Sequence, residues 1–473
     1  MVNRPLLLLM VCAAALAAAP ACLAAPLSLA EAQVRVLEAH PALEAENFEI
    51  EAAVALAALA RLRPNPVLSL EVEDLRWSGV DSRGTASNLG VGLEGLNAGI
   101  ARERGDDGGS GPDDAEWTLS LEQPVELGGK RGKRGALAER EADVARARLE
   151  VTRFNLLSEA ALAFVEVLGA QEECALLDAA RARLQPLHEA VDAGVQAGKY
   201  PPVDSLQSLQ IVEQLGLARR DAETRLRVAR QALAGMWGAA SADFDSVDGA
   251  LPAAPGFPKD LAWQEAAKLH PLYREWDAVL AASEAEYALA RAERLPDIAV
   301  TLGYRTRGGA DASSRGWSAG TDGVGWTGSD ESGDREHSVL LGVSVPLPLF
   351  NRNRGSIAAA QYRMQSASAR QQAALRELER RMNVLAVEIE GEIGALTEAS
   401  GRLLPRLREI EASTLAGYNQ GRFNAFDYMQ VLEDELELEQ ALLARRTRLY
   451  QAVVELERLS GRPLAAVSEA AAK

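Results

Sequence analysis

Apolar and polar residues alternate in four stretches of the chain, which is the pattern of β-strands with one apolar and one polar face. In the first stretch, the order from Leu68 to Glu73 is Leu-Ser-Leu-Glu-Val-Glu. Each pair of stretches is joined by a segment rich in Gly, Ser and Asp, which predicts two hairpins with long loops. The predicted strands are residues 67–78 with 115–124 and residues 297–306 with 337–347.

A long stretch with helical periodicity follows each predicted hairpin. The first runs from about Leu127 to about Val195, roughly 70 residues, which as one helix would be about 100 Å long. It stops near residues 198–202, where a Gly is followed by two Pro, and the helical pattern then returns. The second hairpin is followed by the same arrangement, with a long helix from Ser356 and a stop near residues 420–425. We therefore predict two long helical hairpins, each with a tight turn at its tip.

A single offset relates the two halves of the chain. Gly421 lies 223 residues after Gly198 (421 − 198), and Asp427 lies 223 residues after Asp204 (427 − 204). Because the same offset covers the tip and the helix that follows it, we interpret the chain as a duplicated unit. The predicted repeats are residues 25–248 and residues 249–473.

Residues 1–24 show the order of a secretory signal peptide, in which Arg4 precedes an apolar run and a stretch of small residues. Removal of this segment leaves Cys174 as the remaining cysteine, so no disulfide framework is predicted. A lipidated N-terminus at Cys22 is the alternative interpretation, although a proline stands two residues before it, where that motif does not favour one.

The composition agrees with long helices in lateral contact, because 48% of the residues are hydrophobic and only 5% are aromatic. The formal charge of −18 argues against nucleic acid as a partner and for an acidic surface or lumen that tolerates cations. After the signal segment no stretch is long and apolar enough for a transmembrane helix, so any membrane span would have to be formed by strands.

The predicted strands have the length of about ten residues that crosses an outer membrane when tilted. About four strands per chain cannot close a barrel, because closed membrane barrels begin at about eight strands. The predicted fold class is therefore mainly α with a membrane β part: several subunits contribute strands to one β-barrel, and their helices continue it as an α-helical tube.

No enzyme active site is predicted. The sequence holds no recognisable Ser-His-Asp or Cys-His arrangement, and its carboxylates are spread along helix faces. The four His are scattered and the six Met do not cluster, so neither a metal site nor a cofactor is predicted.

The junction between the first hairpin and its helix is rich in Gly and cations. A phosphate-binding loop requires Ser or Thr where Arg131 stands, so we interpret the segment as an elbow between strand and helix. We expect the cations of both junctions to lie near lipid headgroups. The predicted elbow residues are Gly128, Gly129, Lys130, Arg131, Arg352 and Arg354.

Several motifs carry a family resemblance. They are Arg-Pro-Asn-Pro at residues 63–66, Ser-Leu-Glu-Gln-Pro-Val-Glu-Leu-Gly-Gly-Lys-Arg at 120–131, Val-Pro-Leu-Pro-Leu-Phe-Asn at 345–351, and Gly-Arg-Phe at 421–423 with Asp427. With these motifs the sequence resembles the TolC family of outer-membrane efflux factors, and within it the cobalt-zinc-cadmium resistance branch. The likeness covers essentially the whole chain after the signal segment.

The resemblance implies a homotrimer in the outer membrane of a Gram-negative cell, in contact with outer-membrane lipid. Its three subunits would share one β-barrel, and an α-helical barrel would extend into the periplasm. There the helical tips would meet a periplasmic adaptor (membrane fusion) protein, and the assembly would include an inner-membrane proton-driven pump of the RND type.

The resemblance also implies roles for single residues. Asp427 matches a family position at the closed aperture, but Gln430 stands where a second Asp is common, so a double acidic ring is not expected. Asp204 is predicted to take part in the aperture or, as an equal alternative, to cap the helix after the first tip. The predicted adaptor-contact residues are Gly198, Lys199, Tyr200, Gly421, Arg422 and Phe423.

Lumen-lining residues follow from the strand alternation. The apolar face suits lipid, and the polar face, with Glu71, Glu73 and Glu122, suits a water-filled lumen. The predicted function is the outer-membrane channel of a tripartite efflux system that exports heavy-metal cations. Two alternatives remain: a duct of the same fold for drugs or for type I protein secretion, and a structural coiled-coil protein of the envelope without a pore.

Overall fold

The computed structural model describes residues 26–73, 89–92, 116–251, 263–308, 316–320, 323–329 and 335–461. The predicted signal segment and Cys22 lie outside these residues. The chain divides into a sheet unit, Ile50–Val144 and Ala278–Ala369, and a helical unit, Met1–Glu49, Ala145–Asp277 and Arg370–Lys473. Among the described residues, no helix combines the length and the apolar character that a membrane crossing requires.

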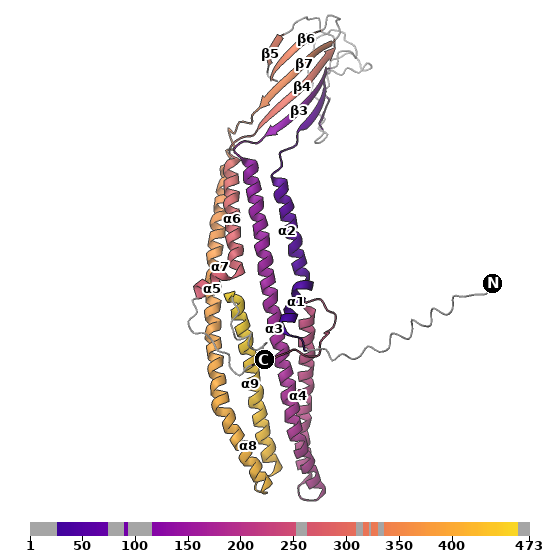
Figure 1. The fold of residues 1–473 in the computed structure, drawn as a ribbon, viewed down its shortest axis with the longest axis vertical. Helices are drawn as coiled ribbons and strands as arrows, with labels where there is room; N and C mark the ends of the chain where they lie inside the picture. Colours follow the sequence, from indigo (N-terminus) through magenta and orange to yellow (C-terminus); the bar gives the residue numbers. More distant parts are fainter. Residues whose placement is uncertain are drawn as a thin grey trace, which may run out of the picture. The chain divides into compact units, whose positions relative to one another are not determined.

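Four long antiparallel strands form the centre of the sheet (Figure 1). They are β1 (Val67–Glu73), β3 (Glu116–Val125), β4 (Ile298–Gly308) and β7 (Arg335–Ser344). The strand pair of the first repeat lies beside that of the second, because β3 pairs with β4 over its whole length. The outer pairs are β1 with β3 and β4 with β7.

Three further strands extend this sheet where the sequence predicted only loops. They are β2 (Leu89–Gly92), β5 (Gly316–Gly320) and β6 (Gly323–Ser329), and the sheet order is β2-β1-β3-β4-β7-β6-β5. In β2, Leu-Gly-Val-Gly, and at the start of β6, Gly-Val-Gly-Trp, glycine takes every second position. The pattern is therefore apolar and glycine instead of apolar and polar, and a search for amphipathic strands misses it.

The last strand ends earlier than predicted. The sequence placed residues 345–347 in the fourth strand, but β7 ends at Ser344. Pro346 and Pro348 have no amide hydrogen to donate to a ladder, so the segment leaves the sheet.

The central strands expose their apolar side chains. Leu70, Leu119, Tyr304 and Val339 are aligned across β1, β3, β4 and β7, and all four are exposed. On the opposite face, Glu116 and Thr118 of β3 are buried. This burial pattern is the reverse of that of a water-soluble sheet.

The helices include the two long hairpins that the sequence predicted, with an additional break near the second tip (Figure 1). They are α1 (Leu29–Ala39), α2 (Pro41–Ala60), α3 (Lys130–Gln196), α4 (Pro202–Gly235), α5 (Trp263–Leu269), α6 (Pro271–Ala292), α7 (Arg354–Glu398), the π-helix η2 (Ala399–Leu403), α8 (Leu404–Asn419) and α9 (Ala425–Ser460).

Buried residues recur every seven positions on the long helices of the helical unit, which is the spacing of a coiled-coil seam. These rows supply much of the apolar core. They are Leu177, Leu184 and Val191 on α3; Ser208, Leu215, Ala222 and Ala229 on α4; Met382, Ile389 and Leu396 on α7; and Leu442, Leu449 and Leu456 on α9.

A π-helix precedes Pro405 in the second long helical hairpin. Pro405 stands in the first turn of α8, where its missing amide hydrogen is tolerated. The ring of a proline clashes with the carbonyl four residues earlier, and the wider turn of Ala399–Leu403 accommodates it.

His270 lies at the start of α6, where its ring nitrogen Nδ1 accepts a hydrogen bond from the backbone N–H of Leu272 at 3.0 Å. The ring is buried and packs edge-on against Phe154, with centroids 5.4 Å apart. Burial, together with the positive charge of Arg458, lowers the pKa of His270 to about 4.

This lowered pKa predicts a loss of stability in mild acid. The unfolded chain binds a proton at His270 near pH 6.5 but the folded chain only near pH 4, so stability is fully present above about pH 6.5 and falls toward pH 4, by roughly 2–3 kcal/mol. His270→Asn keeps a hydrogen-bond acceptor but does not titrate. Thermal unfolding in detergent should therefore show a larger drop between pH 8 and pH 5 for the wild type than for His270→Asn. Parallel drops would contradict the prediction.

Candidate functional site

The two helical tips have the same backbone geometry. At the first tip the backbone N–H of Lys199 donates to the carbonyl of Gly194 at 2.8 Å, and at the second that of Arg422 donates to Gly417 at 2.8 Å. Gly198 and Gly421 have φ angles of 72° and 73°, a left-handed conformation that glycine adopts without strain. Each tip thus depends on a glycine that ends the helix.

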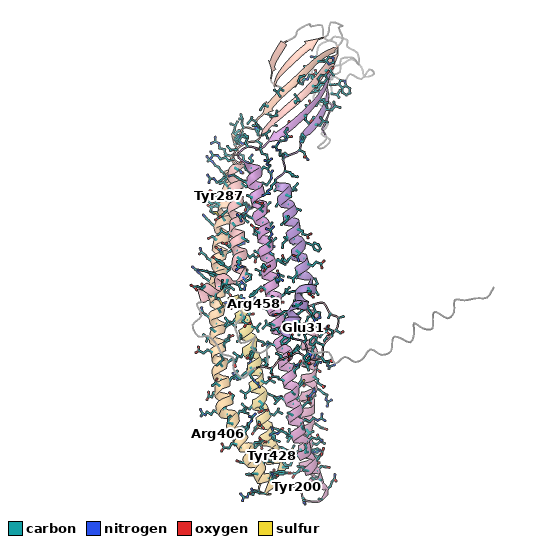
Figure 2. All side chains as sticks on the ribbon, viewed as in Figure 1. Glu31, Tyr200, Tyr287, Arg406, Tyr428 and Arg458 are labelled. Carbon is teal, nitrogen blue, oxygen red and sulfur yellow. The ribbon has the colours of Figure 1, made fainter. Side chains whose placement is uncertain are left out.

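An aromatic ring closes each tip against its own helix. A Cβ atom added to Gly194 would lie 2.2 Å from the ring of Tyr200, and one added to Gly417 would lie 2.2 Å from that of Phe423. Tyr200 lies at the turn between α3 and α4 (Figure 2). The two rings are therefore held by the tips themselves, and they are exposed together with Lys199 and Arg422.

The two acidic candidates of the aperture have different local roles. Asn424 Oδ1 accepts from the N–H of Asp427 at 2.8 Å, and Asp427 Oδ2 accepts from the N–H of Asn424 at 3.0 Å, which forms a capping box at the start of α9. Asp204 forms no such cap, because α4 begins at Pro202 without a side-chain cap. The capping alternative for Asp204 was therefore wrong, and the cap is found at Asp427 in the other repeat.

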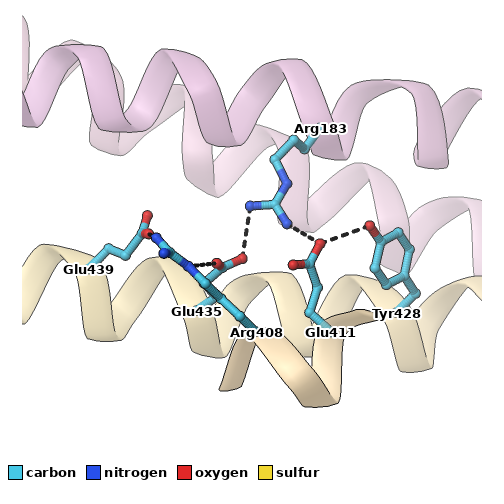
Figure 3. Close-up of polar contacts among 6 residues, drawn as sticks. All are labelled: Arg183, Arg408, Glu411, Tyr428, Glu435 and Glu439. Carbon is cyan, nitrogen blue, oxygen red and sulfur yellow. Dashed lines mark hydrogen bonds and ion pairs between the residues drawn. The ribbon is translucent and has the colours of Figure 1, made fainter. Parts of the chain in front are cut away.

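A network of charged residues links α3 to α8 and α9 (Figure 3). Arg183 of α3 donates to Glu435 of α9 at 2.8 Å and to Glu411 of α8. Arg408 of α8 lies 3.5 Å from the same Glu435 and donates to Glu439 at 3.0 Å. One arginine thus connects the first helical hairpin with both helices of the second.

Glu435 is the centre of this network. Its side chain is only 5% exposed, and two guanidinium groups compensate its buried charge. Partial burial opposes the charge on Arg183, but the hydrogen bonds to Glu435 and Glu411 outweigh this effect and raise the pKa of the guanidinium. Arg183 therefore stays charged at any physiological pH.

Tyr428 extends the network toward the second tip. Its hydroxyl donates to Glu411 at 3.2 Å, and its ring stacks on that of Tyr418. Burial and the negative charge of Glu411 raise the pKa of the Tyr428 phenol, so it keeps the proton that it donates. Sequence analysis missed this network. Its signal was the charged Glu435 in the seven-residue row of buried positions that continues with Leu442.

The chain matches the family model described as outer membrane efflux protein at residues 33–239 and 262–462. The chain belongs to this family. The resemblance predicted from the junction and tip motifs is thereby confirmed. As a member of the outer membrane efflux protein family, the chain is part of an efflux channel in the outer membrane.

Its relatives include proteins named for metal resistance. The chain is 28% identical over 348 residues to the cobalt-zinc-cadmium resistance protein CzcC of Cupriavidus metallidurans, covering 73% of this chain and 77% of that protein. It is 26% identical over 306 residues to the nickel-cobalt-cadmium resistance protein NccC of Alcaligenes xylosoxydans xylosoxydans, covering 64% of this chain and 63% of that protein. The crystal structures of CusC share its fold, with a TM-score of 0.67, 15% identity and 92% of both chains covered.

The elbow of this outer membrane efflux protein is held internally. Lys130 Nζ lies 2.7 Å from Asp297 Oδ1, which also accepts from the backbone N–H of Leu127 at 3.0 Å. The side chain of Lys130 is therefore buried in this ion pair and does not project from the surface, although the sequence grouped it with the cations expected near lipid headgroups. Gly128 and Gly129 have φ angles of 70° and 68°, and they form the bend between β3 and α3. Arg131 is exposed, as are Arg352 and Arg354 at the second junction.

The polar face of the sheet carries an ion pair that the sequence did not reveal. Glu116 of β3 lies 2.7 Å from Arg305 of β4 and 3.9 Å from Arg307. Of the predicted lumen residues, Glu73 and Glu122 are half-buried and Glu71 is exposed. These three lie on β1 and β3, on the face opposite the exposed apolar rows.

No metal site is found in the part of the chain that the structure describes. There, no group of three or more His, Cys, Asp and Glu side chains is arranged to hold an ion. The polar groups of the tips and of the charged network make hydrogen bonds and ion pairs with one another. These contacts suit a role in holding the helices in position.

The rings of Tyr200 and Phe423 pack directly on Gly194 and Gly417. We therefore predict that neither glycine can be replaced by alanine without destabilising its tip. Gly417→Ala should displace Phe423 and destabilise the second tip by about 1–3 kcal/mol, as overpacking does. Gly391→Ala in α7, where nothing lies within 4 Å of the added Cβ, is the matched control. Hydrogen exchange of the amides at residues 420–424 should become faster in Gly417→Ala and stay at the wild-type rate in the control. Equal rates in all three proteins would exclude this role of the glycine.

Proposed function

We propose that this chain is the outer-membrane exit duct of a tripartite pump that exports divalent heavy-metal cations. The observation that carries the proposal is the likeness to relatives named for resistance to cobalt, zinc, cadmium and nickel, which covers 73% of the chain for CzcC. Acidic side chains on the polar face of the sheet support it, because they lower the free energy of a cation in a narrow passage. The duct itself would be passive, and an inner-membrane RND pump would supply the energy.

The duct would be a homotrimer, and two exposed apolar rows support this. On α4, Leu206, Leu217 and Val228 are exposed at intervals of 11 residues. On α7 and α8, Val387 and Ile410 are exposed as well. Two different apolar faces on one chain suit a head-to-tail contact between copies, which closes into a ring when the rotation between copies is correct.

The tips would be the contact with a periplasmic adaptor protein. Lys199 and Arg422 project beside the left-handed glycines Gly198 and Gly421, and the exposed rings of Tyr200 and Phe423 lie next to them. Because both tips repeat the same geometry, an adaptor hairpin would meet equivalent surfaces on each repeat.

Opening would take place near these tips. Asp427 is exposed, and three copies around one axis would form a ring of carboxylates that binds divalent cations. The Arg183 network would hold the two hairpins of a subunit together in the resting state, because Arg183 alone joins α3 to Glu411 and Glu435 within that network. Asp204, intermediate in exposure on α4, would face the same opening.

Asp427→Gln separates the aperture role from the capping role. Gln at this position retains the reciprocal hydrogen bond of a capping box but carries no charge. In planar bilayers with a divalent cation present, the Gln variant should conduct at least about twofold better than the wild type, because the ring no longer holds a blocking cation. Asp427→Glu, which keeps the cap and the charge, should behave as wild type. If the Gln variant conducts like the wild type, the constriction lies elsewhere.

The same recordings test the network. Arg183→Gln removes the charge that bridges the two hairpins and should increase the time that the channel is open. Arg181→Gln, two residues away on the same helix and on a different side, is the control. An equal effect of both substitutions would assign it to surface charge and not to the network.

Export of metals predicts a specific phenotype. Deletion of the gene should sensitise cells to zinc, cobalt, cadmium or nickel salts, and the wild-type gene on a plasmid should restore growth. The minimal inhibitory concentrations of these salts and of a panel of drugs and dyes measure the effect. A change confined to drugs and dyes would favour the duct for drugs, and unchanged values for both would remove the efflux role.

A further inference from the structure

The loop that follows β7 keeps three large apolar side chains at the surface. Leu347 is 71% exposed, Leu349 is 66% exposed and Phe350 is fully exposed. Pro346 and Pro348 have no amide hydrogen, so this loop offers a poor edge for pairing with a strand of another chain. Side chains of this size remain uncovered in a folded protein chiefly where something apolar lies against them.

These side chains continue a row that begins in the sheet. Val339, Leu341 and Val343 of β7 are exposed on the apolar face, and the same alternation continues through Val345, Leu347 and Leu349. In an outer membrane protein, the exposed apolar face of a strand is the face in contact with lipid. Because exposed apolar side chains continue from the strand along the loop that follows it, lipid is the occupant that the structure favours for the loop as well.

The row ends at a groove that contains two arginines. The groove has a volume of about 330 Å³ and lies at the start of β4 and the end of β7. Its lining combines apolar, cationic and amide side chains and one carboxylate. The lining residues are Glu293, Arg294, Pro296, Pro346, Leu347, Pro348, Asn351, Arg352 and Asn353.

The groove is rigid on one side and positively charged on the other. Asn353, at φ 56°, donates from its side-chain nitrogen to the carbonyl of Ala290 at 3.0 Å and to Glu293 at 3.3 Å, and this fixes the loop to α6. Arg294 and Arg352 are exposed, and neither forms an ion pair with another residue that the structure describes. With Glu293 held by Asn353, the two guanidinium groups are available for an anion.

We infer that this groove binds a phospholipid of the inner leaflet of the outer membrane. The phosphate of the headgroup faces Arg294 and Arg352, and the acyl chains lie along Leu347, Leu349 and Phe350. Guanidinium groups suit this task because they bind phosphate oxygens through two parallel hydrogen bonds. The order of the side chains, apolar along the strand and cationic where the strand has ended, matches the order of acyl chain and headgroup. The inference rests on the outer-membrane location and is independent of the exported substrate.

Retention of lipid by the purified full-length protein tests the headgroup site. The protein is supplied with phosphatidylglycerol in mild detergent, and bound lipid is counted by native mass spectrometry. Arg294→Glu/Arg352→Glu should reduce retention on the order of tenfold, because two attractive charges become repulsive. The matched control is Arg370→Glu/Arg406→Glu, which reverses two exposed arginines outside the groove and should retain lipid as the wild type does.

Equal retention in the groove variant and the wild type would overturn the proposal. An excess of inorganic phosphate provides a second readout, since it should leave the lipid bound. Displacement of the lipid by phosphate alone would show that the groove recognises the free anion, which also overturns a lipid site.

The position of the loop is tested in vesicles of phosphatidylethanolamine and phosphatidylglycerol. In the variant Phe350→Cys, an environment-sensitive dye is attached to the new cysteine. The protein without this substitution is treated with the same dye to measure background labelling of the buried Cys174. Folding should not depend on Phe350, because its side chain is fully exposed. A quencher attached to an acyl chain should quench the dye more strongly than a water-soluble quencher. Stronger quenching from water, or protection from both quenchers as in a contact between copies, would contradict the inference.

Discussion

The sheet exposes Leu70, Leu119 and Tyr304 while it buries Glu116 on its other face, and in water this arrangement would cost free energy. Each Å² of apolar surface left in water costs about 25 cal/mol, so rows of exposed leucine, valine and aromatic side chains are stable only against lipid or protein. The outer membrane supplies the first of these. Contact with lipid thus explains the reversed burial of the strands, and it agrees with the membership of the chain in an outer membrane family.

The helices solve a different problem, because they lie in water and must hold each other. Buried positions every seven residues on α3, α4, α7 and α9 form continuous seams, and Glu435 interrupts the seam of α9. A buried carboxylate destabilises the packing of a seam unless a positive charge pairs with it. Glu435 is tolerated in the seam because Arg183 and Arg408 pair with it. They add polar bonds to a contact between the hairpins that also includes a buried apolar cluster of α3, α4 and α9. Such polar bonds can be exchanged for water when the helices separate.

Periodicity alone predicted the four long strands, the long helices and the two tips, because each depends on residues that are neighbours in sequence. Contacts between distant residues were not predictable in this way. Lys130 was expected at the membrane because nothing near it in sequence indicates its pairing with Asp297. β2 and the start of β6 were missed because glycine replaces the polar half of the alternation. Capping was one of two equal alternatives for Asp204, but α4 begins with two prolines and has no side-chain cap, whereas Asn424 and Asp427 cap α9.

Within the described residues, the outer strands β2 and β5 of the sheet each have a partner on one side only. Lipid does not satisfy the hydrogen-bonding groups of an unpaired strand edge, which supports the proposal that copies of the chain complete each other. The mass of the complex extracted from the membrane tests this most directly. Native mass spectrometry of the full-length protein should give three chains per complex. A single chain that is stable in the membrane would contradict it.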